Sequence, residues 1–199
     1  MPAAVLLVAA LVRVGAGAGA PVDDDDHLGW LTQVSFTALH SHPGTTSPTL
    51  KGFTASTGIK VDYRSEIDGN DTFYTKYSPF LEKGQGIGAD IIVLTSWMAS
   101  RFIKKGWVQE FDAANFPNKA NVVDSRANVS WDPGRKFSVP WAIGQTGIAY
   151  YPDKVGGKLT SISDILDPKF KNRVSILDEM RDTIGLFMLD MGLDPSTGS

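Results

Sequence analysis

Residues 89–106 read ADIIVLTSWMASRFIKKG, and this stretch decides the fold class. It contains four consecutive apolar residues, Ile91 to Leu94, and such a run is typical of a β-strand covered on both faces. The residues that follow, 96–105, predict a helix that ends at Gly106. The stretch therefore predicts a buried strand followed directly by a helix.

Upstream of this stretch, helix and strand patterns alternate. Residues 47–58 begin with Ser-Pro and predict a short helix that Gly58 ends. Residues 59–63, IKVDY, alternate between apolar and polar like a half-buried strand. Residues 71–83 have apolar side chains at helical spacing and predict a second helix, which Pro79 is expected to bend. Alternating strands and helices indicate an α/β fold with a parallel sheet.

Downstream of Gly106 the pattern changes to shorter segments. WVQEFD (107–112), KFSVPWAIG (136–144) and TGIAYY (146–151) predict short strands separated by Asn, Pro and Gly. SISDIL (161–166) and DEMRDTIGLFMLDMG (178–192) predict a return to helix. A domain boundary is expected within residues 138–151.

Composition limits the classes of partner. The chain has 199 residues, 19 of them basic and 22 acidic, for a formal net charge of -3. This balance leaves no basic stripe of the kind that nucleic acid requires, so no nucleic-acid partner is expected. The sequence contains no cysteine, which excludes disulfides, thiolate metal sites and a thiol nucleophile.

Residues 1–47 form an atypical leader. An apolar run from Ala3 to Val12 is followed by small residues and then by four consecutive aspartates from Asp23. The run is too short to span a bilayer, and with the small residues after it the pattern resembles a secretory signal. We therefore expect export from the cytoplasm.

Several motif-like stretches do not predict a catalytic or metal site. GQGIG (84–88) lies before a predicted strand, whereas a phosphate-binding glycine loop follows a strand and opens a helix, so a plain turn is expected. Residues 68–71, DGND, lack the pattern of a calcium loop and predict a turn plus a helix cap. The three histidines, His27, His40 and His42, lack accompanying ligands and are expected to be solvated. No hydrolase or nucleotide-binding motif occurs, and we expect no metal and no cofactor.

Residues 174–192, VSILDEMRDTIGLFMLDMG, gather acids where a strand-like run turns into a helix-like run. Asp178, Glu179 and Asp182 lie at spacings that place them on one helical face, where they repel one another, with Arg181 beside them. Capping of the helix amino terminus explains one acid but not three. From these residues alone, capping and a cation-binding site both remain open.

Four blocks of the sequence together resemble one known family. They are LKGFTASTGIKVDY (50–63), GADIIVLTSWMASRFIKKGWVQEFD (88–112), GRKFSVPWAIGQTGIAYY (134–151) and KFKNRVSILDEMRDTIGLFMLDMG (169–192). In this order and spacing they are similar to the bacterial polyamine-binding proteins, the spermidine and putrescine receptors of ABC importers. The resemblance covers residues 48 to about 194.

This resemblance implies a two-lobed α/β fold of the periplasmic-binding-protein type (type II), with polyamine held in a cleft between the lobes. Residues 48–140 are then the first lobe, and residues 141–199 the hinge crossing and the start of the second lobe. The implied partners are a polyamine ligand and the membrane permease subunits of an importer. The implied location is the periplasmic space or the outer face of the cell membrane.

The resemblance also implies ligand-binding residues. After the strand in block two, the family presents a small hydroxyl residue and an aromatic to the ligand, and Thr95 and Trp97 match these positions. Trp97 beside Met98 has an alternative interpretation as a core residue. The family's acids after the next strand correspond to Glu179 and Asp182. Aromatic walls and carboxylates suit a methylene chain with ammonium ends, and no catalytic residue is needed because no bond is broken.

Two departures from the family are visible. Residues 34–44, VSFTALHSHPG, lack the family's aromatic ligand residues, and Thr37 and His40 stand near their places. The sequence also stops at Ser199, shortly after the acidic helix, so the chain is expected to be an incomplete, amino-terminal fragment of the fold. Two other functions stay open: a receptor for another small solute, or a carboxylate-dependent hydrolase with two acids across one cleft.

Overall fold

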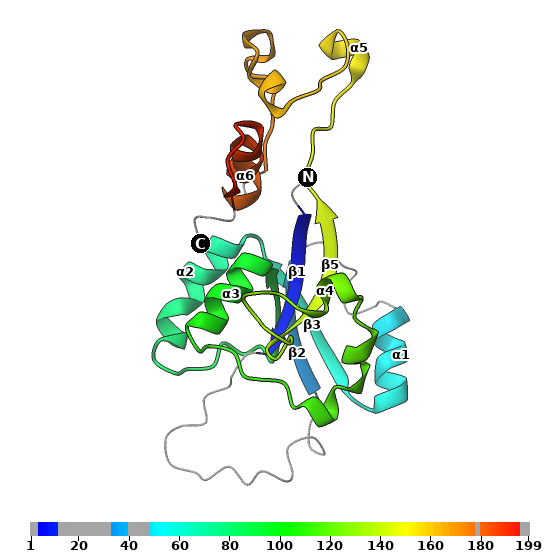
Figure 1. Cartoon of the computed structure of the whole chain (residues 1–199). Helices are drawn as coiled ribbons and strands as arrows, with labels where there is room; N and C mark the ends of the chain where they lie inside the picture. Colours follow the sequence, from blue (N-terminus) through cyan, green and yellow to red (C-terminus); the bar gives the residue numbers. More distant parts are fainter. Residues whose placement is uncertain (1–3, 12–32, 40–47, 178–179, 196–199) are drawn as a thin grey trace. The chain divides into compact units, whose positions relative to one another are not determined.

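The structure is a computed structural model that describes residues 4–11, 33–39, 48–177 and 180–195. Its strands are β1 (Ala4–Leu11), β2 (Gln33–Leu39), β3 (Lys60–Ile67), β4 (Ile91–Thr95) and β5 (Ser138–Gln145) (Figure 1). Its α-helices are α1 (Pro48–Thr57), α2 (Asn70–Leu81), α3 (Ser96–Lys104), α4 (Asp124–Ala127), α5 (Pro152–Val155) and α6 (Met180–Asp190). Short 3-10 helices occur at Ala113–Asn115, Pro117–Asn121, Ile162–Leu166 and Pro168–Phe170.

The chain divides into two compact units, and the division falls inside β5. The sheet unit comprises Leu6–Ala142, and the carboxy-terminal unit comprises Ile143–Ser199 together with Met1–Val5. The division between Ala142 and Ile143 lies within the segment 138–151, where the sequence changes character.

The five strands form one sheet in the order β3-β2-β4-β1-β5. β2 pairs in parallel with both β3 and β4, as the alternation of strands and helices predicts. β1 pairs antiparallel with β4, with Ala9 opposite Val93. The sheet is therefore mixed: the predicted parallel pairs are present, and residues 4–11 of the signal-like run add an antiparallel strand that the sequence did not predict.

β4 is covered on both faces, which confirms the interpretation of its apolar run. Ile92 and Leu94 belong to a core cluster that includes Phe73 of α2 and Phe102 of α3. Val93 points to the opposite face, where it packs with Tyr63 and with residues that include Leu50 of α1. Helices α2 and α3 thus cover one face of the sheet and α1 the other (Figure 1).

The predicted helices of the sheet unit are confirmed with their glycine stops. Gly58 after α1 and Gly106 after α3 have φ angles of 74° and 68°, the left-handed region in which glycine is favoured. Pro79 lies inside α2, as expected. DGND forms a turn and the start of α2, and Gly69 within it is the N-cap residue, without a side-chain capping hydrogen bond; the predicted turn and helix cap are confirmed.

The predicted short strands were only partly correct. KFSVPWAIG contains β5, but residues 107–112 and 146–151 form no strand in the structure, and neither do residues 174–177. The predicted helix at SISDIL is a 3-10 helix, and residues 180–190 of the last predicted helix form α6. Among the described residues, no helix is both long enough and apolar enough to cross a membrane.

Candidate functional site

Thr95 lies at the carboxyl end of β4 and is the N-cap residue of α3. Its backbone is extended, with φ -64° and ψ 154°, and its side chain makes no capping hydrogen bond to the helix. The residue is 5% exposed, and in the described part of the chain its Oγ1 atom has no hydrogen-bond partner. A buried hydroxyl without a hydrogen-bond partner destabilises the folded chain. A polar group that bound at the end of β4 and paired with this hydroxyl would relieve that cost.

Asn70 holds the β4–α3 turn in place. Its side chain is 1% exposed, and its Oδ1 atom accepts a hydrogen bond of 3.2 Å from the backbone N–H of Thr95. The bond joins the start of α2 to the residue predicted to contact ligand. Sequence reasoning missed this role because it treated residues 68–71 only as a turn and cap. The partner lies 25 residues away, and no local pattern points to it.

Trp97 occupies the first turn of α3 and is half-buried. Its side chain packs against the core cluster that contains Met98 and Phe102. This packing agrees with its interpretation as a core residue, and the partial exposure leaves part of the residue accessible. A ligand-binding role for Trp97 stays a prediction.

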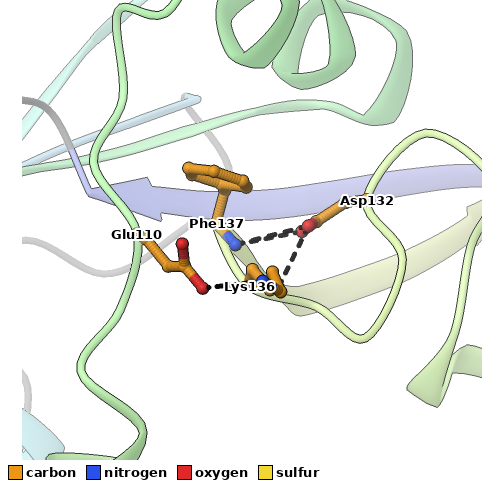
Figure 2. A network of polar contacts seen from close by, with 4 residues as sticks. All are labelled: Glu110, Asp132, Lys136 and Phe137. Carbon is orange, nitrogen blue, oxygen red and sulfur yellow. Dashed lines mark hydrogen bonds and ion pairs between the residues drawn. The ribbon is translucent and has the colours of Figure 1, made fainter.

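A buried polar network precedes β5, and sequence reasoning also missed it. Asp132 is 1% exposed, and its carboxylate accepts hydrogen bonds from the backbone N–H groups of Lys136 and Phe137. Figure 2 shows these bonds, together with the ion pair of 3.2 Å between Lys136 and Glu110. The Ser138 hydroxyl donates a further bond of 2.6 Å to the same carboxylate. Asp132 thereby fixes the residues with which β5 begins.

Arg135 completes this network. Its Nε atom donates to the backbone oxygen of Arg126 at 2.9 Å, and its Nη1 atom donates to the Ser138 hydroxyl at 3.1 Å. The guanidinium also lies 5.1 Å from the centre of the Trp131 ring. Burial lowers the pKa of Arg135, the charge of Asp132 opposes that shift, and the charge of Arg126 adds to it. Asp-Pro-Gly at 132–134 is a turn signal that could have drawn attention to this segment.

Asp182 lies in the first turn of α6, in the carboxy-terminal unit. Burial raises the pKa of its half-buried carboxyl group, because a low-dielectric environment disfavours the charged form. Among the described residues no cation pairs with Asp182. The other two acids of the stretch, Asp178 and Glu179, lie outside the described residues. Thr95 and Trp97 belong to the sheet unit and Asp182 to the carboxy-terminal unit.

The carboxy-terminal unit contains a hollow of about 520 Å³. The residues that line it are mostly apolar and include Ile148, Ile165, Phe170, Ile176 and Leu186. Of the predicted site residues that the structure describes, Thr95, Trp97 and Asp182, none lines this hollow. The described lining residues include no Asp or Glu side chain.

The described residues contain no group of three or more His, Asp or Glu side chains that could hold a metal ion. His27, His40 and His42 lie outside the described residues. Of the two residues near the family's aromatic positions, Thr37 lies in β2, whereas His40 is one of these histidines.

Comparison with known proteins places this arrangement in a family. A family model described as bacterial extracellular solute-binding protein matches residues 88–197. Spermidine/putrescine-binding periplasmic protein 1 of Haemophilus influenzae is 32% identical over 149 residues, which cover 74% of this chain and 40% of that protein. The spermidine/putrescine-binding periplasmic protein of Escherichia coli is 28% identical over the same length, covering 74% of this chain and 41% of that protein.

Two solved structures share the fold. A chain from Listeria monocytogenes, described as a spermidine/putrescine ABC transporter, matches with a TM-score of 0.69 and 24% identity, covering 82% of this chain and 49% of that one. The substrate-binding protein of a spermidine/putrescine ABC transporter from Streptococcus pneumoniae matches with a TM-score of 0.58 and 22% identity, covering 84% and 50%. These likenesses confirm the predicted α/β solute-binding-protein fold, of which this chain contains a part.

The chain spans less than half the length of the curated relatives it matches. The family model nevertheless covers more than half of the chain, and it includes β4, α3, the Asp132 network and α6. The chain belongs to the family of bacterial extracellular solute-binding proteins.

Proposed function

We propose that this chain is part of the substrate-binding component of an ABC importer for polyamines, the class that includes spermidine and putrescine. The observation that carries the proposal is the 32% identity, over 149 residues, to a spermidine/putrescine-binding periplasmic protein of Haemophilus influenzae. The proposed place of action is the periplasmic space, as in the name of that relative, or the outer face of the cell membrane. The proposed macromolecular partners are the permease subunits of the importer.

Ligand capture is assigned to Thr95, Trp97, Glu179 and Asp182. The Thr95 hydroxyl supplies a hydrogen bond at the end of β4, and the Trp97 ring packs against the methylene chain or an ammonium group. The carboxylates of Glu179 and Asp182 bind ammonium groups through charge-assisted hydrogen bonds. The partly buried Asp182 carboxyl, which pairs with no cation among the described residues, supports this assignment because an ammonium ligand would stabilise its charged form.

The proposal is tested with a completed chain, in which the part of the Haemophilus influenzae relative outside the matched region is joined to this one. Isothermal titration calorimetry with spermidine, putrescine, a neutral amino acid and an oligosaccharide distinguishes a polyamine receptor from a receptor for another solute. We expect binding of one or both polyamines and of neither neutral compound. A folded chain that binds no polyamine contradicts the proposal.

Turnover is measured in the same samples. A carboxylate-dependent hydrolase would release product from a glycoside, whereas a solute-binding protein returns its ligand unchanged. Mass spectrometry of the ligand after incubation distinguishes the two, and we expect the polyamine to be recovered intact.

A further inference from the structure

Thr183, the fourth residue of α6, makes a hydrogen bond that reaches back beyond the helix. Its Oγ1 atom donates to the backbone carbonyl of Leu177 at 2.6 Å, within the ordinary range for a hydroxyl donor. Leu177 lies before Met180, the first residue of α6. The bond is therefore not part of the helix itself, and it joins the helix to the segment that leads into it.

This bond differs from the one that a helical threonine ordinarily makes. A Ser or Thr hydroxyl inside a helix usually donates to a carbonyl three or four residues earlier in the same helix. Thr57 of α1 does so, because its Oγ1 atom donates to the Phe53 carbonyl at 2.8 Å. Thr183 instead donates to a carbonyl six residues earlier. Its hydroxyl thus fixes the way in which the chain enters α6.

The bond closes a loop of main chain that carries the predicted cation-binding residues. Between Leu177 and Thr183 the sequence has three acids, Asp178, Glu179 and Asp182. The first turn of a helix lacks intrahelical partners for its N–H groups, and helix ends open more readily than the middle. A bond that spans this turn opposes the opening, so it also restricts the positions that the acids can take.

The other end of α6 is held separately. The carboxylate of Asp190, the last residue of the helix, accepts hydrogen bonds from the Ser161 hydroxyl at 2.5 Å and from the Ile162 N–H at 3.2 Å. The Ser163 hydroxyl donates a further bond to the same carboxylate. These bonds do not involve the start of α6. Loss of the Thr183 bond is therefore expected to loosen only the end of the helix that carries the acids.

The affinity of a site for a charged ligand depends on how far its carboxylates are held in place before the ligand arrives. We propose that Thr183 is a positioning residue for cation capture: through the Leu177 carbonyl, its hydroxyl holds the acid-bearing start of α6 in the geometry that receives an ammonium group. Thr183 itself contacts no ligand and acts through Glu179 and Asp182. The inference rests on the proposed function and adds a residue to its site.

The test uses the completed chain and two replacements of Thr183. Thr183→Val removes the hydroxyl and keeps the β-branched shape, whereas Thr183→Ser keeps the donor. In calorimetry with spermidine and putrescine, we expect Thr183→Val to weaken binding by about three- to tenfold, the size of one neutral hydrogen bond. Thr183→Ser should bind like the wild type.

Thr57→Val is the matched control. It removes a hydroxyl–carbonyl bond of the same kind from α1, in the sheet unit. Because Thr57 and Thr183 each lose one exposed hydrogen bond, the two valine variants should have similar melting temperatures. Only Thr183→Val should lose affinity, which a merely stabilising role of the bond does not predict.

Two further measurements examine the route by which Thr183 acts. In the ligand-free completed chain, hydrogen–deuterium exchange at the first turn of α6 should be faster in Thr183→Val than in the wild type, and unchanged in Thr183→Ser. In a double-mutant cycle, Thr183→Val should cost less affinity in the presence of Asp182→Asn than it does alone, because one carboxylate fewer is left to position.

Several results would overturn the positioning role while the chain still binds polyamine. These are equal affinities of Thr183→Val and the wild type, a loss that Thr183→Ser shares, and a loss of the same size with and without Asp182→Asn. A completed wild-type chain that binds no polyamine contradicts the proposed function instead. The exchange rates at the first turn of α6 then decide by themselves whether the Thr183 bond holds the start of the helix.

Discussion

Asn70 and Thr95 are joined by a hydrogen bond between the buried Asn70 Oδ1 atom and the Thr95 backbone N–H, at 3.2 Å. Asn70 is the first residue of α2 and Thr95 the last residue of β4. This bond connects the helix that covers the sheet to the turn that presents the first candidate ligand residues. The position of Thr95 and Trp97 therefore depends on a residue that has no predicted contact with ligand.

Replacement of Asn70 by alanine should destabilise the chain. The change removes the acceptor and leaves the Thr95 N–H buried without its partner, at a cost of about 1–3 kcal/mol in the free energy of unfolding. Urea denaturation followed by fluorescence measures this difference. Asp71→Ala is the control, since Asp71 is the exposed neighbour on the same helical turn. Equal midpoints for the wild type and Asn70→Ala would show that the bond contributes nothing.

Asp132→Asn should destabilise the chain more than Asn70→Ala does. Oδ1 of Asp132 accepts from the Lys136 N–H, and Oδ2 accepts from the Phe137 N–H and the Ser138 hydroxyl, so an amide nitrogen at either position would face a donor. The change also removes the negative charge near the buried Arg135. We expect a loss of about 3 kcal/mol in the free energy of unfolding.

Glu110→Gln is the matched control for Asp132, because it breaks the exposed ion pair with Lys136 in the same network (Figure 2). An exposed ion pair contributes about 0–1 kcal/mol. The two variants should thus differ clearly in chemical denaturation. Similar small losses for both would mean that the buried network does not stabilise the start of β5.

Trp97→Leu keeps much of the packing volume and removes the aromatic face. In the completed chain we expect polyamine affinity to fall by about 0.5–2 kcal/mol, the range of a cation–π contact. Calorimetry measures the affinity and thermal melting checks the fold. Tyr151→Leu, at an exposed aromatic residue of the other unit, should have no effect on affinity. Unchanged affinity in a folded Trp97→Leu protein would assign Trp97 to packing alone.

The pH dependence of stability should differ between Asp182 and Asp190, which both lie on α6. Burial raises the folded-state pKa of Asp182 above its ordinary value of 3.8, so the folded chain holds this proton more tightly than the unfolded chain. The contribution of Asp182 to stability therefore falls as pH rises from about 3.8 through the folded pKa. Asp182→Asn should remove this decline and melt at a higher temperature at neutral pH.

For Asp190 the sign is opposite. Hydrogen bonds from the side chains of Ser161 and Ser163 lower its pKa below 3.8. Its contribution is present above that value and is lost as pH falls through the folded pKa. Asp190→Asn should consequently reduce the melting temperature at neutral pH, and the difference from wild type should shrink in acid. Melting temperatures of the two variants are measured between pH 3 and 7. If they change with pH in the same way, the opposite pKa shifts of Asp182 and Asp190 are contradicted.

The three acids Asp178, Glu179 and Asp182 should separate into a cap and a cation site. Asparagine caps a helix nearly as well as aspartate, so Asp178→Asn should affect only stability, and only slightly. The sequence spacing predicts that Glu179 and Asp182 repel each other on one helical face, so Glu179→Gln and Asp182→Asn should each leave the ligand-free chain as stable or more so. Each should weaken polyamine binding in the completed chain by about ten- to a hundredfold, the loss of one charge-assisted hydrogen bond.

Melting temperature and affinity, measured for all three variants, decide between the two roles. Simple capping predicts lower melting temperatures and unchanged affinity. That outcome at Glu179 and Asp182 would remove both residues from the proposed site.

The sequence by itself determined the strand β4, the helices α1, α2 and α3, and the family. These features depend on local information. An unbroken apolar run from Ile91 to Leu94 must be covered on both faces, and Gly58 and Gly106 end helices because their backbones adopt positive φ angles. The family blocks also follow from residue order alone, and Thr95 and Trp97 were named as site residues on that basis.

Only the tertiary structure decided which segments become strands and which buried polar groups meet. Residues 4–11 form a strand because β4 lies alongside them, whereas residues 147–150 and 174–177 have strand-like sequences and no partner among the described residues. A strand takes its hydrogen bonds from another segment, so its own residues cannot guarantee it. The bond between Asn70 and Thr95 follows the same rule: its two ends are 25 residues apart, and only the packing of α2 against the sheet brings them together.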